Sequence, residues 1–304
     1  MHIGANIRGE TENMVLNKHG SFYLRSGWGT KIIQAVEADE MIFTPANELK
    51  AVDNIGLGRV MIKALRYWAD ATGLTEEKKV QEGIKENKTY LFDLINENDR
   101  YFQKSGSLLL LHRNLARNDE NATAWYWAFN EFGRNTFGKE EFVEGFQYYL
   151  AVNGTNIKRN AVDKEYNCFK NTYLGEKRRD IKMVMDEDTY PLLAPLNLLR
   201  INENKKIEKN MLSSTDIPLL ILIYSIAVDN KKESTEGRQI SIDKIMEEKK
   251  QVGKYFCIRY SKLIEMLLEA QNKRLLSLNN NFGNRYIEFE DLNYEKLLQY
   301  YYAE

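Results

Sequence analysis

The chain has 304 residues, of which 43% are hydrophobic and 29% are charged. This composition is typical of a globular protein and excludes a disordered chain. The 43 Lys and Arg residues nearly balance the 44 Asp and Glu residues, so the formal net charge is -1. The molecule as a whole is therefore not a general polyanion binder, and any contact with nucleic acid must come from local basic surfaces.

Cysteine and histidine are too few and too scattered for a zinc finger, because the chain has two Cys and three His. We expect no leader segment, and the longest apolar stretch, residues 217–228, is shorter than the roughly 20 residues of a membrane helix. The sequence therefore predicts a reduced, cytoplasmic protein with no membrane partner. Only four prolines occur, which favours long helices and a mainly α fold class.

Residues 1–88 are predicted to form an N-terminal helix-turn-helix or winged-helix domain. Apolar residues recur at helical spacing over 47–55 and 60–68, on either side of a Gly56-Leu57-Gly58 turn. The second helix is basic opposite its apolar stripe, a geometry that places side chains in the major groove of DNA. The alternative is an ordinary solvated helix face. The basic residues of this helix are Arg59, Lys63 and Arg66.

Residues 89–210 are predicted to form a helical middle domain with a basic segment. Aromatic residues crowd the stretch 125–132, which indicates packing between helices. Basic residues outnumber acidic ones over 158–182, so this segment is a candidate phosphate track, with a solvated surface as the alternative. Its candidate DNA contacts are Lys158, Arg159, Lys164, Lys170, Lys177, Arg178 and Arg179.

Residues 211–304 are predicted to form a C-terminal winged-helix-like domain. The expected elements are a helix over 217–228, a charged loop over 229–238, helices over 241–249 and 258–271, and a hairpin over 274–289 whose turn is 279–284. In this interpretation Arg274 and Arg285 flank the wing and are further candidate DNA contacts.

Nucleotide-binding motifs are absent from the sequence. No Gly-rich loop followed by Lys and Ser or Thr occurs, and the two Gly-x-Gly runs lack the third glycine of a dinucleotide site. No nucleotide cofactor is therefore expected. Serine-hydrolase elbows and zinc-protease helices are missing as well.

Residue types suited to a nuclease are present. A nuclease needs groups that activate water and stabilise phosphate, such as carboxylates with Mg or Mn, or a histidine with a basic partner. The candidate catalytic residues are His19, Arg25, Asp99 and His112. A buried structural histidine is the alternative for His112, which follows four leucines, and His19 with Arg25 either packs a core or forms a site. The acidic run 186–188 could bind a metal or begin a solvated helix.

Several short motifs resemble, in the same order, one bacterial family of unknown function found in SspB-like proteins of DNA phosphorothioation clusters. The motifs are His19-Gly20-Ser21-Phe22 with Arg25 and Gly27-Trp28, Ile55-Gly56-Leu57-Gly58 with Met61-Ile62-Lys63 and Arg66-Tyr67-Trp68, Leu109-Leu110-Leu111-His112 with Leu115-Ala116, Lys164-Glu165 with Cys168-Phe169-Lys170 and Thr172-Tyr173, Pro195-Leu196 with Leu198, and Val252-Gly253-Lys254-Tyr255-Phe256. The resemblance covers nearly the whole chain. Two positions depart from it: Ser21 replaces a glutamate, and Glu165 replaces an aspartate.

The resemblance implies a part in single-strand DNA phosphorothioation and phage defence. It also implies DNA nicking beside cysteine desulfurase and ATPase partners, and the loss of the glutamate at Ser21 puts nicking in question. We therefore hold two main hypotheses, a DNA-nicking component of such a system and a non-catalytic DNA-binding regulator or adaptor. A protein-interaction scaffold is the third class, and a homodimer is an open alternative to a monomer.

Overall fold

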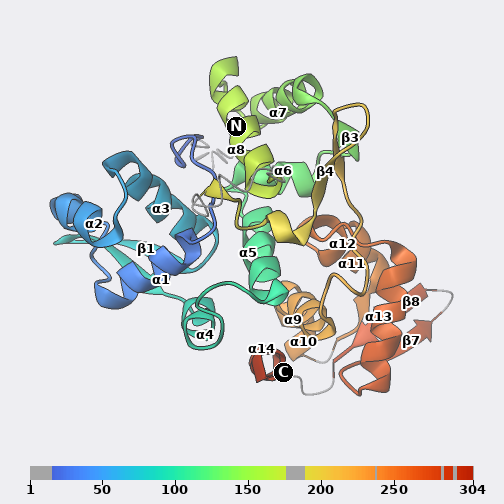
Figure 1. The fold of residues 1–304 in the computed structure, drawn as a ribbon. Helices are drawn as coiled ribbons and strands as arrows, with labels where there is room; N and C mark the ends of the chain where they lie inside the picture. Colours follow the sequence, from blue (N-terminus) through green and yellow to red (C-terminus); the bar gives the residue numbers. More distant parts are fainter. Residues whose placement is uncertain (1–15, 176–188, 237, 282–283, 290–292, 304) are drawn as a thin grey trace, which may run out of the picture.

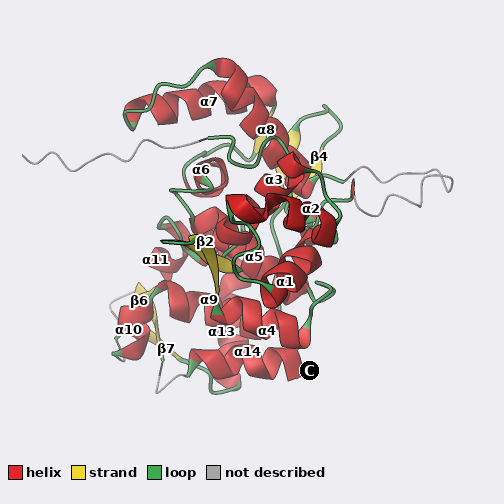
Figure 2. Ribbon diagram, turned by 90° about the vertical axis from the view of Figure 1, so that its left-hand side faces the viewer, coloured by secondary structure: helices red, strands yellow, loops and turns green. Residues whose placement is uncertain are grey.

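The computed structural model describes residues 16–175, 189–236, 238–281, 284–289 and 293–303. Helices make up most of this part of the chain, and the strands form three small antiparallel sheets (Figures 1 and 2). The predicted mainly α class is confirmed. None of the described helices has the length and apolar character needed to cross a membrane.

The N-terminal segment folds into three helices followed by a hairpin, at the left of Figure 1. These elements are α1 (Trp28–Ala38), a 3-10 turn η1 (Pro45–Asn47), α2 (Glu48–Ile55), α3 (Arg59–Ala71), β1 (Thr75–Val80) and β2 (Gly83–Lys88). The two predicted helices are confirmed as α2 and α3. Gly56, with φ of 70°, ends α2 in the left-handed conformation that glycine adopts without strain.

The hairpin β1–β2 is not predicted by the sequence pattern. Its strands read TEEKKV and GIKENK, and Glu, Lys and Asn are depleted in strands generally. Its inner face nevertheless packs against α3, because Thr75 and Glu86 are buried there. Tertiary burial, which a local pattern does not report, therefore stabilises these strands.

The middle of the chain is helical, as predicted. Its elements are α4 (Tyr90–Asn98), α5 (Ser105–Arg117), α6 (Thr123–Asn130), β3 (Thr136–Phe137), α7 (Lys139–Val152), α8 (Arg159–Tyr173), η4 (Ala194–Leu196), β4 (Leu199–Ile201) and β5 (Ile207–Lys209). The aromatic side chains of α6 are buried, and Trp125 packs edge-on against Trp68 of α3 with 5.4 Å between ring centres. The expectation that these aromatics form core is confirmed.

The C-terminal segment contains more helices than predicted. Its elements are α9 (Leu219–Asp229), α10 (Lys231–Thr235), β6 (Ile240–Ser241), α11 (Ile242–Glu247), α12 (Val252–Tyr255), α13 (Tyr260–Asn272), β7 (Ser277–Asn281), β8 (Asn284–Glu288) and α14 (Tyr294–Ala303). The predicted loop over 229–238 is wrong, because α10 follows α9 after a single residue. The hairpin is present, but its strands extend into the predicted turn over 279–284.

The buried apolar side chains form one continuous cluster from α1 to α14. The central helix α5 contacts α6, α9 and α12, and α14 packs along α9. Tyr301 of α14 accepts a hydrogen bond from the amide of Gly106 at 2.9 Å, and a side chain at Gly106 would overlap its ring. The last helix is thereby fixed to the start of α5.

Candidate functional site

The predicted catalytic His19 is buried, with 1% exposure. Its Nδ1 accepts a hydrogen bond from the Ser21 amide at 3.0 Å, so Nε2 carries the proton and faces the Glu165 carboxylate at 3.2 Å. The ring also packs against Tyr67 and Trp68 of α3. His19 therefore links the N-terminal segment to α3 and α8.

Arg25 lies among aromatic rings. Its guanidinium carbon is 5.5 Å from the ring centres of Phe22, Tyr23 and Trp28. Its backbone bridges to Pro191, and within the described part of the chain its Nε is buried without a hydrogen bond. Arg25 and His19 are near in sequence but share none of these contacts.

Of the other two predicted catalytic residues, Asp99 follows α4 and lies at the start of α5, and His112 lies within α5. Asp99 accepts hydrogen bonds from the amides of Gln103 and Lys104 and from the Ser107 hydroxyl, at 2.8, 3.0 and 2.6 Å, and so satisfies donors at the start of the helix. His112 is fully buried between Tyr173 and the Tyr255 carbonyl. Burial lowers the pKa of His112 to about 4, so the ring is neutral at pH 7. The four predicted residues thus contact different neighbours and do not form one site.

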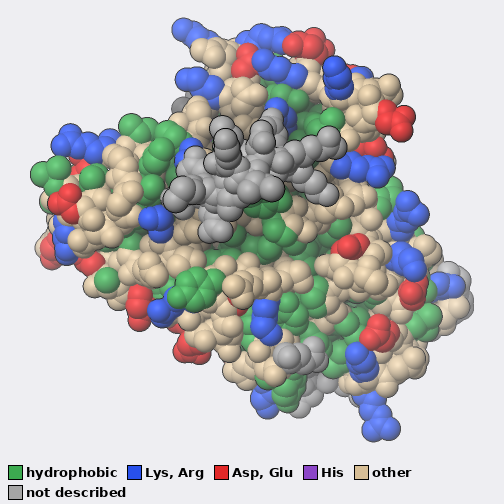
Figure 3. Space-filling view, viewed as in Figure 1, with side chains coloured by type: hydrophobic (Ala, Val, Ile, Leu, Met, Phe, Trp, Pro, Cys, Tyr) green, Lys and Arg blue, Asp and Glu red, His purple; other side chains and the backbone are tan. Residues whose placement is uncertain are grey.

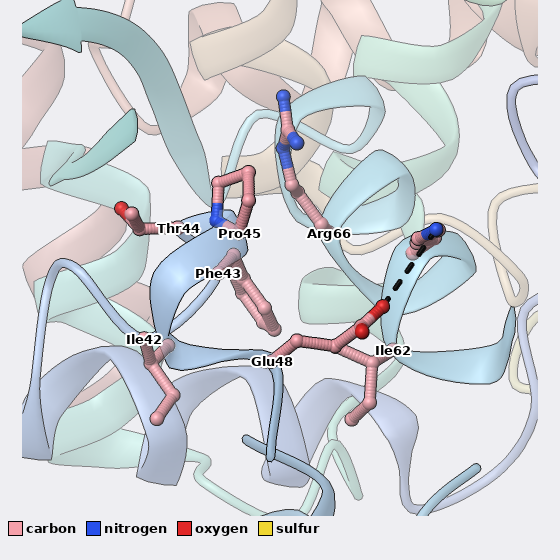
Figure 4. Close-up of a pocket in the computed structure, with 8 residues that line it drawn as sticks. Ile42, Phe43, Thr44, Pro45, Glu48, Ile62 and Arg66 are labelled. Carbon is pink, nitrogen blue, oxygen red and sulfur yellow. Dashed lines mark ion pairs between the residues drawn. The ribbon is translucent and has the colours of Figure 1, made fainter. Parts of the chain in front are cut away.

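The predicted DNA contacts on α3 differ in exposure. The side chains of Arg59 and Lys63 are 62% and 74% exposed, and each lies 3.7 Å from the Glu48 carboxylate. A hollow of about 290 Å³ lies beside the Lys63–Glu48 ion pair, and Phe43, Glu48 and Ile62 are among the residues that line it (Figure 4). Arg66, by contrast, is drawn back onto the hairpin by an Nε hydrogen bond to Glu77 at 2.8 Å.

The remaining predicted DNA contacts are dispersed. Lys158, Arg159 and Lys164 are exposed at the start of α8, where Arg159 is paired with Glu140, and Lys170 is half-buried further along. Arg274 and Arg285 are exposed around the C-terminal hairpin. Lys177, Arg178 and Arg179, and the acidic run 186–188, lie outside the described residues. Acidic and basic side chains alternate over the face drawn in Figure 3.

An open cleft of about 590 Å³ brings the α3 cations together with residues that the sequence pattern does not single out. The cleft lies between α3, β1, the N-terminal segment and the loop after α5. We call it the α3–β1 cleft, and its lining residues are Lys18, Lys63, Arg66, Tyr67, Asp70, Glu77, Lys79 and Asn121. Four cations and two carboxylates thus share one hollow.

The Asp70 carboxylate lies between the β1 backbone and Asn121 in the α3–β1 cleft. The Glu77 amide is 3.5 Å from Asp70 Oδ1, and Asp70 Oδ2 accepts a hydrogen bond from the Asn121 side-chain amide at 2.9 Å. Lys18 donates to the Asn121 side-chain oxygen at 2.6 Å. Burial raises the pKa of Asp70, and the neighbouring Glu77 charge adds to the rise.

A third carboxylate lies beneath Arg66. Glu86 is opposite Glu77 in the hairpin register, and its side chain is fully buried. One oxygen accepts a hydrogen bond from the Thr75 hydroxyl at 2.7 Å, while the other is 3.8 Å from Arg66 Nε. Burial raises the pKa of Glu86 to about 7. Arg66 therefore separates two like charges that would otherwise repel across the hairpin.

The described residues contain no group of three or more His, Cys, Asp and Glu side chains that could hold a metal ion. A closed protein cage for a metal is thus missing from this part of the chain. Mg²⁺, however, is commonly held by one or two carboxylates, with waters and substrate phosphate completing its six oxygen ligands. In the α3–β1 cleft, Glu77 Oε2 is bound by Arg66 and Asp70 Oδ2 by Asn121.

Five residues of the cleft were not singled out from the sequence: Lys18, Asp70, Glu77, Lys79 and Asn121. The only local signal was the alternation of Glu77 and Lys79, which places both on one face of a strand. Using that signal required the hairpin to be recognised first. Lys18 and Asn121 are 103 residues apart, and nothing in the local pattern links them.

Comparisons with known proteins agree with this fold. The chain matches the family described as "Protein of unknown function (DUF4007)" over residues 16–302. Two solved structures, titled "Magnesium ion-bound SspB crystal structure" and "SspB crystal structure", match with TM-scores of 0.82 and 0.80. Each is 22% identical, and the match covers 95% of this chain and 88% of the other. No curated protein matches. The chain therefore belongs to the DUF4007 family of proteins of unknown function and has the SspB fold.

Proposed function

We propose that this protein is a DNA-binding component of a single-strand DNA phosphorothioation and phage-defence system. The observation that carries the proposal is the α3–β1 cleft, where Lys18, Lys63, Arg66 and Lys79 meet at one open surface. Clustered cations of this kind neutralise phosphates and release counterions, although the molecule as a whole is almost uncharged.

The order of elements supports two winged-helix units. In the N-terminal unit α1, α2 and α3 precede the β1–β2 hairpin, so α3 holds the position of a recognition helix and the hairpin that of a wing. In the C-terminal unit β6 precedes α11 to α13, and these helices precede the β7–β8 hairpin, with strand order β6-β8-β7. The exposed Arg59 and Lys63 at the start of α3 are the groups that would reach DNA.

The link to phosphorothioation rests on the SspB fold and on the motifs shared with SspB-like proteins. On this basis DNA is the proposed substrate, and cysteine desulfurase and ATPase proteins are the proposed partners in the cytoplasm. A non-catalytic regulator or adaptor is supported by the fact that the predicted catalytic residues contact different neighbours. These residues are His19, Arg25, Asp99 and His112. Nicking is the second candidate, and it is favoured by the carboxylates beside the cations of the α3–β1 cleft.

Charge reversal on α3 tests DNA binding. We expect the double change Arg59→Glu and Lys63→Glu to weaken binding to duplex DNA and to lower the log–log salt slope by about 0.9 for each phosphate that is no longer neutralised. Binding of a labelled duplex would be measured by fluorescence anisotropy at several salt concentrations. Lys296→Glu, at an exposed position of α14, is the matched control. Identical curves for the double variant and wild type would exclude α3 from the interface.

A further inference from the structure

A second hollow shares two cations with the α3–β1 cleft. Lys63 and Arg66 line both concavities, and residues 42–45, Glu48 and Ile62 complete the lining of the second one (Figure 4). We call it the α2–α3 hollow. Its volume of about 290 Å³ is close to the lower limit of about 300 Å³ for small-molecule sites. A ligand of one or two flat rings has the corresponding size.

The buried part of this lining is apolar. Ile42, Phe43 and Ile62 are at most 5% exposed and belong to the core cluster, so packing on the core fixes their positions. Apolar and aromatic side chains of this kind favour the weakly hydrated face of an aromatic ring over a sugar or a phosphate. The α2–α3 hollow therefore suits the ring part of a nucleotide.

The wall that α3 does not supply is held in shape by hydrogen bonds. The Thr44 hydroxyl donates to the Ile84 carbonyl at 2.7 Å and accepts from the Ile84 amide at 3.0 Å, which ties this wall to the β1–β2 hairpin. The Asn47 side-chain amide donates to the Met41 carbonyl at 2.9 Å. Because the wall is already formed, little conformational entropy is lost when a ligand enters.

Glu48 supplies a hydrogen-bond acceptor to the α2–α3 hollow. Its carboxylate oxygens lie 3.7 Å from Arg59 Nε and Lys63 Nζ, which is longer than a hydrogen bond, and they accept none from the described residues. A carboxylate accepts from the exocyclic amino group of cytosine, and adenine and guanine carry such groups as well. Thymine has none, and its single ring N–H lies between two carbonyl oxygens that a carboxylate repels.

We propose that the α2–α3 hollow receives one unpaired DNA base that carries an amino group, with Glu48 accepting a hydrogen bond from it. The exposed cations Arg59 and Lys63 beside Glu48 then bind the flanking phosphates. The proposal rests on DNA binding at α3 and adds the form of DNA, a single strand or an opened duplex. A base in a closed duplex must first be unpaired and unstacked, which costs a few kcal/mol.

Fluorescence anisotropy with single-stranded oligo-dC and oligo-dT of equal length tests the hollow. We expect the wild-type protein to bind oligo-dC about tenfold more tightly, within the range for one base-specific contact. Glu48→Met removes the acceptor and keeps the length of the side chain, so the preference should fall below about twofold without weaker binding of oligo-dT. Glu97→Met, at an exposed position of α4, is the control and should keep the tenfold preference.

Filling the hollow gives a second, independent readout. Ile62→Phe should weaken oligo-dC binding about tenfold and leave duplex binding within about threefold of wild type, because a paired base does not enter the hollow. Val152→Phe, at the exposed end of α7, is the control for the added ring. If Ile62→Phe does not fold, the ratio in Glu48→Met alone decides.

Two results would overturn the base site and leave duplex binding standing. One is equal affinity of the wild-type protein for oligo-dC and oligo-dT, and the other is an unchanged preference in Glu48→Met. A wild-type protein that binds neither oligonucleotide nor duplex would instead overturn the proposed DNA-binding function itself.

Discussion

At the residue scale, the two departures from the SspB-like motifs meet at His19. Ser21 contributes its backbone amide to His19 Nδ1 and has a positive φ of 68°, so this bond does not depend on the side chain at position 21. Glu165 faces His19 with one oxygen and accepts the Asn17 amide with the other, at 2.5 Å. An aspartate at 165 would be one methylene shorter and would lose reach to one of them. Both positions therefore act in the contacts that hold the N-terminal segment against the rest of the protein.

Glu86 offers a prediction on pH dependence. Its pKa is about 7 in the folded protein and near 4.5 when unfolded, so the folded state binds its proton more tightly. The protonated Glu86 carboxyl therefore makes its whole contribution to the free energy of unfolding below pH 4.5, and this contribution is lost as the pH rises through 7. Glu86→Gln keeps the shape of the side chain but cannot ionise. We expect the free energy of unfolding of this variant to rise by roughly 2–3 kcal/mol relative to that of wild type as the pH goes from 5 to 8.

Urea unfolding of the wild-type protein and Glu86→Gln at the two pH values would measure this gain. Glu82→Gln, in the hairpin loop, is the control for the same chemical change. A stability difference that is equal at pH 5 and pH 8 would show that Glu86 does not titrate in this range in the folded protein.

At the scale of elements, a buried ion network joins α5, α9 and α12. Asp229 at the end of α9 is fully buried and pairs with Arg113 and with Arg117, the latter at 3.0 Å. Its second oxygen accepts a hydrogen bond from the Tyr255 hydroxyl at 2.5 Å. One carboxylate therefore compensates two guanidinium groups, and the three helices are held in one relative position.

Removing that carboxylate should be costly. We expect Asp229→Asn to lower the free energy of unfolding by about 3–5 kcal/mol, because it leaves the buried Arg113 and the half-buried Arg117 without their shared counter-charge. Chemical denaturation followed by circular dichroism would measure the change, with Asp53→Asn as an exposed control. A decrease below about 1 kcal/mol would mean that water or a rearranged side chain compensates the arginines.

At the scale of the whole molecule, the predicted boundary near residue 210 crosses many contacts. The Lys250 amide donates to the side-chain oxygen of Asn130 at 2.6 Å, and so binds the end of α6. His112 of α5 bonds the Tyr255 carbonyl of α12 at 2.6 Å. The middle and C-terminal segments thus share their buried polar contacts as well as the apolar core.

We therefore predict that residues 211–304 do not fold when they are expressed alone. The fragment would expose Asp229 and the apolar sides of α9 and α12 that α5 covers, and so would lose much of its buried area. Far-UV circular dichroism and amide dispersion in NMR spectra would test this, with co-expression of residues 1–210 as the control that should restore structure. A cooperative thermal transition in the isolated fragment would instead support an independent domain.

Local pattern in the sequence was sufficient for much of the secondary structure. The apolar periodicity of α2, α3 and α13 and the apolar run of α9 identified those helices, and Gly56, in the left-handed conformation, marks the end of α2. The aromatic stretch of α6 was correctly assigned to the core, because so many large rings on one short helix can be buried only between other helices. The shared motifs indicated the family, which the match over residues 16–302 confirms.

Tertiary structure alone decided where the candidate site residues lie. Residue type suggested His19, Arg25, Asp99 and His112 as a site, but hydrogen-bond partners far away in sequence, such as Glu165 and Tyr255, determine the surroundings of the two histidines. The α3–β1 cleft likewise depends on a hairpin rich in Glu and Lys that burial against α3 stabilises, and on Asn121 reaching Asp70 across 51 residues. The sequence by itself determined which segments are amphipathic, whereas convergence of side chains from separate segments depends on long-range packing that no local period encodes.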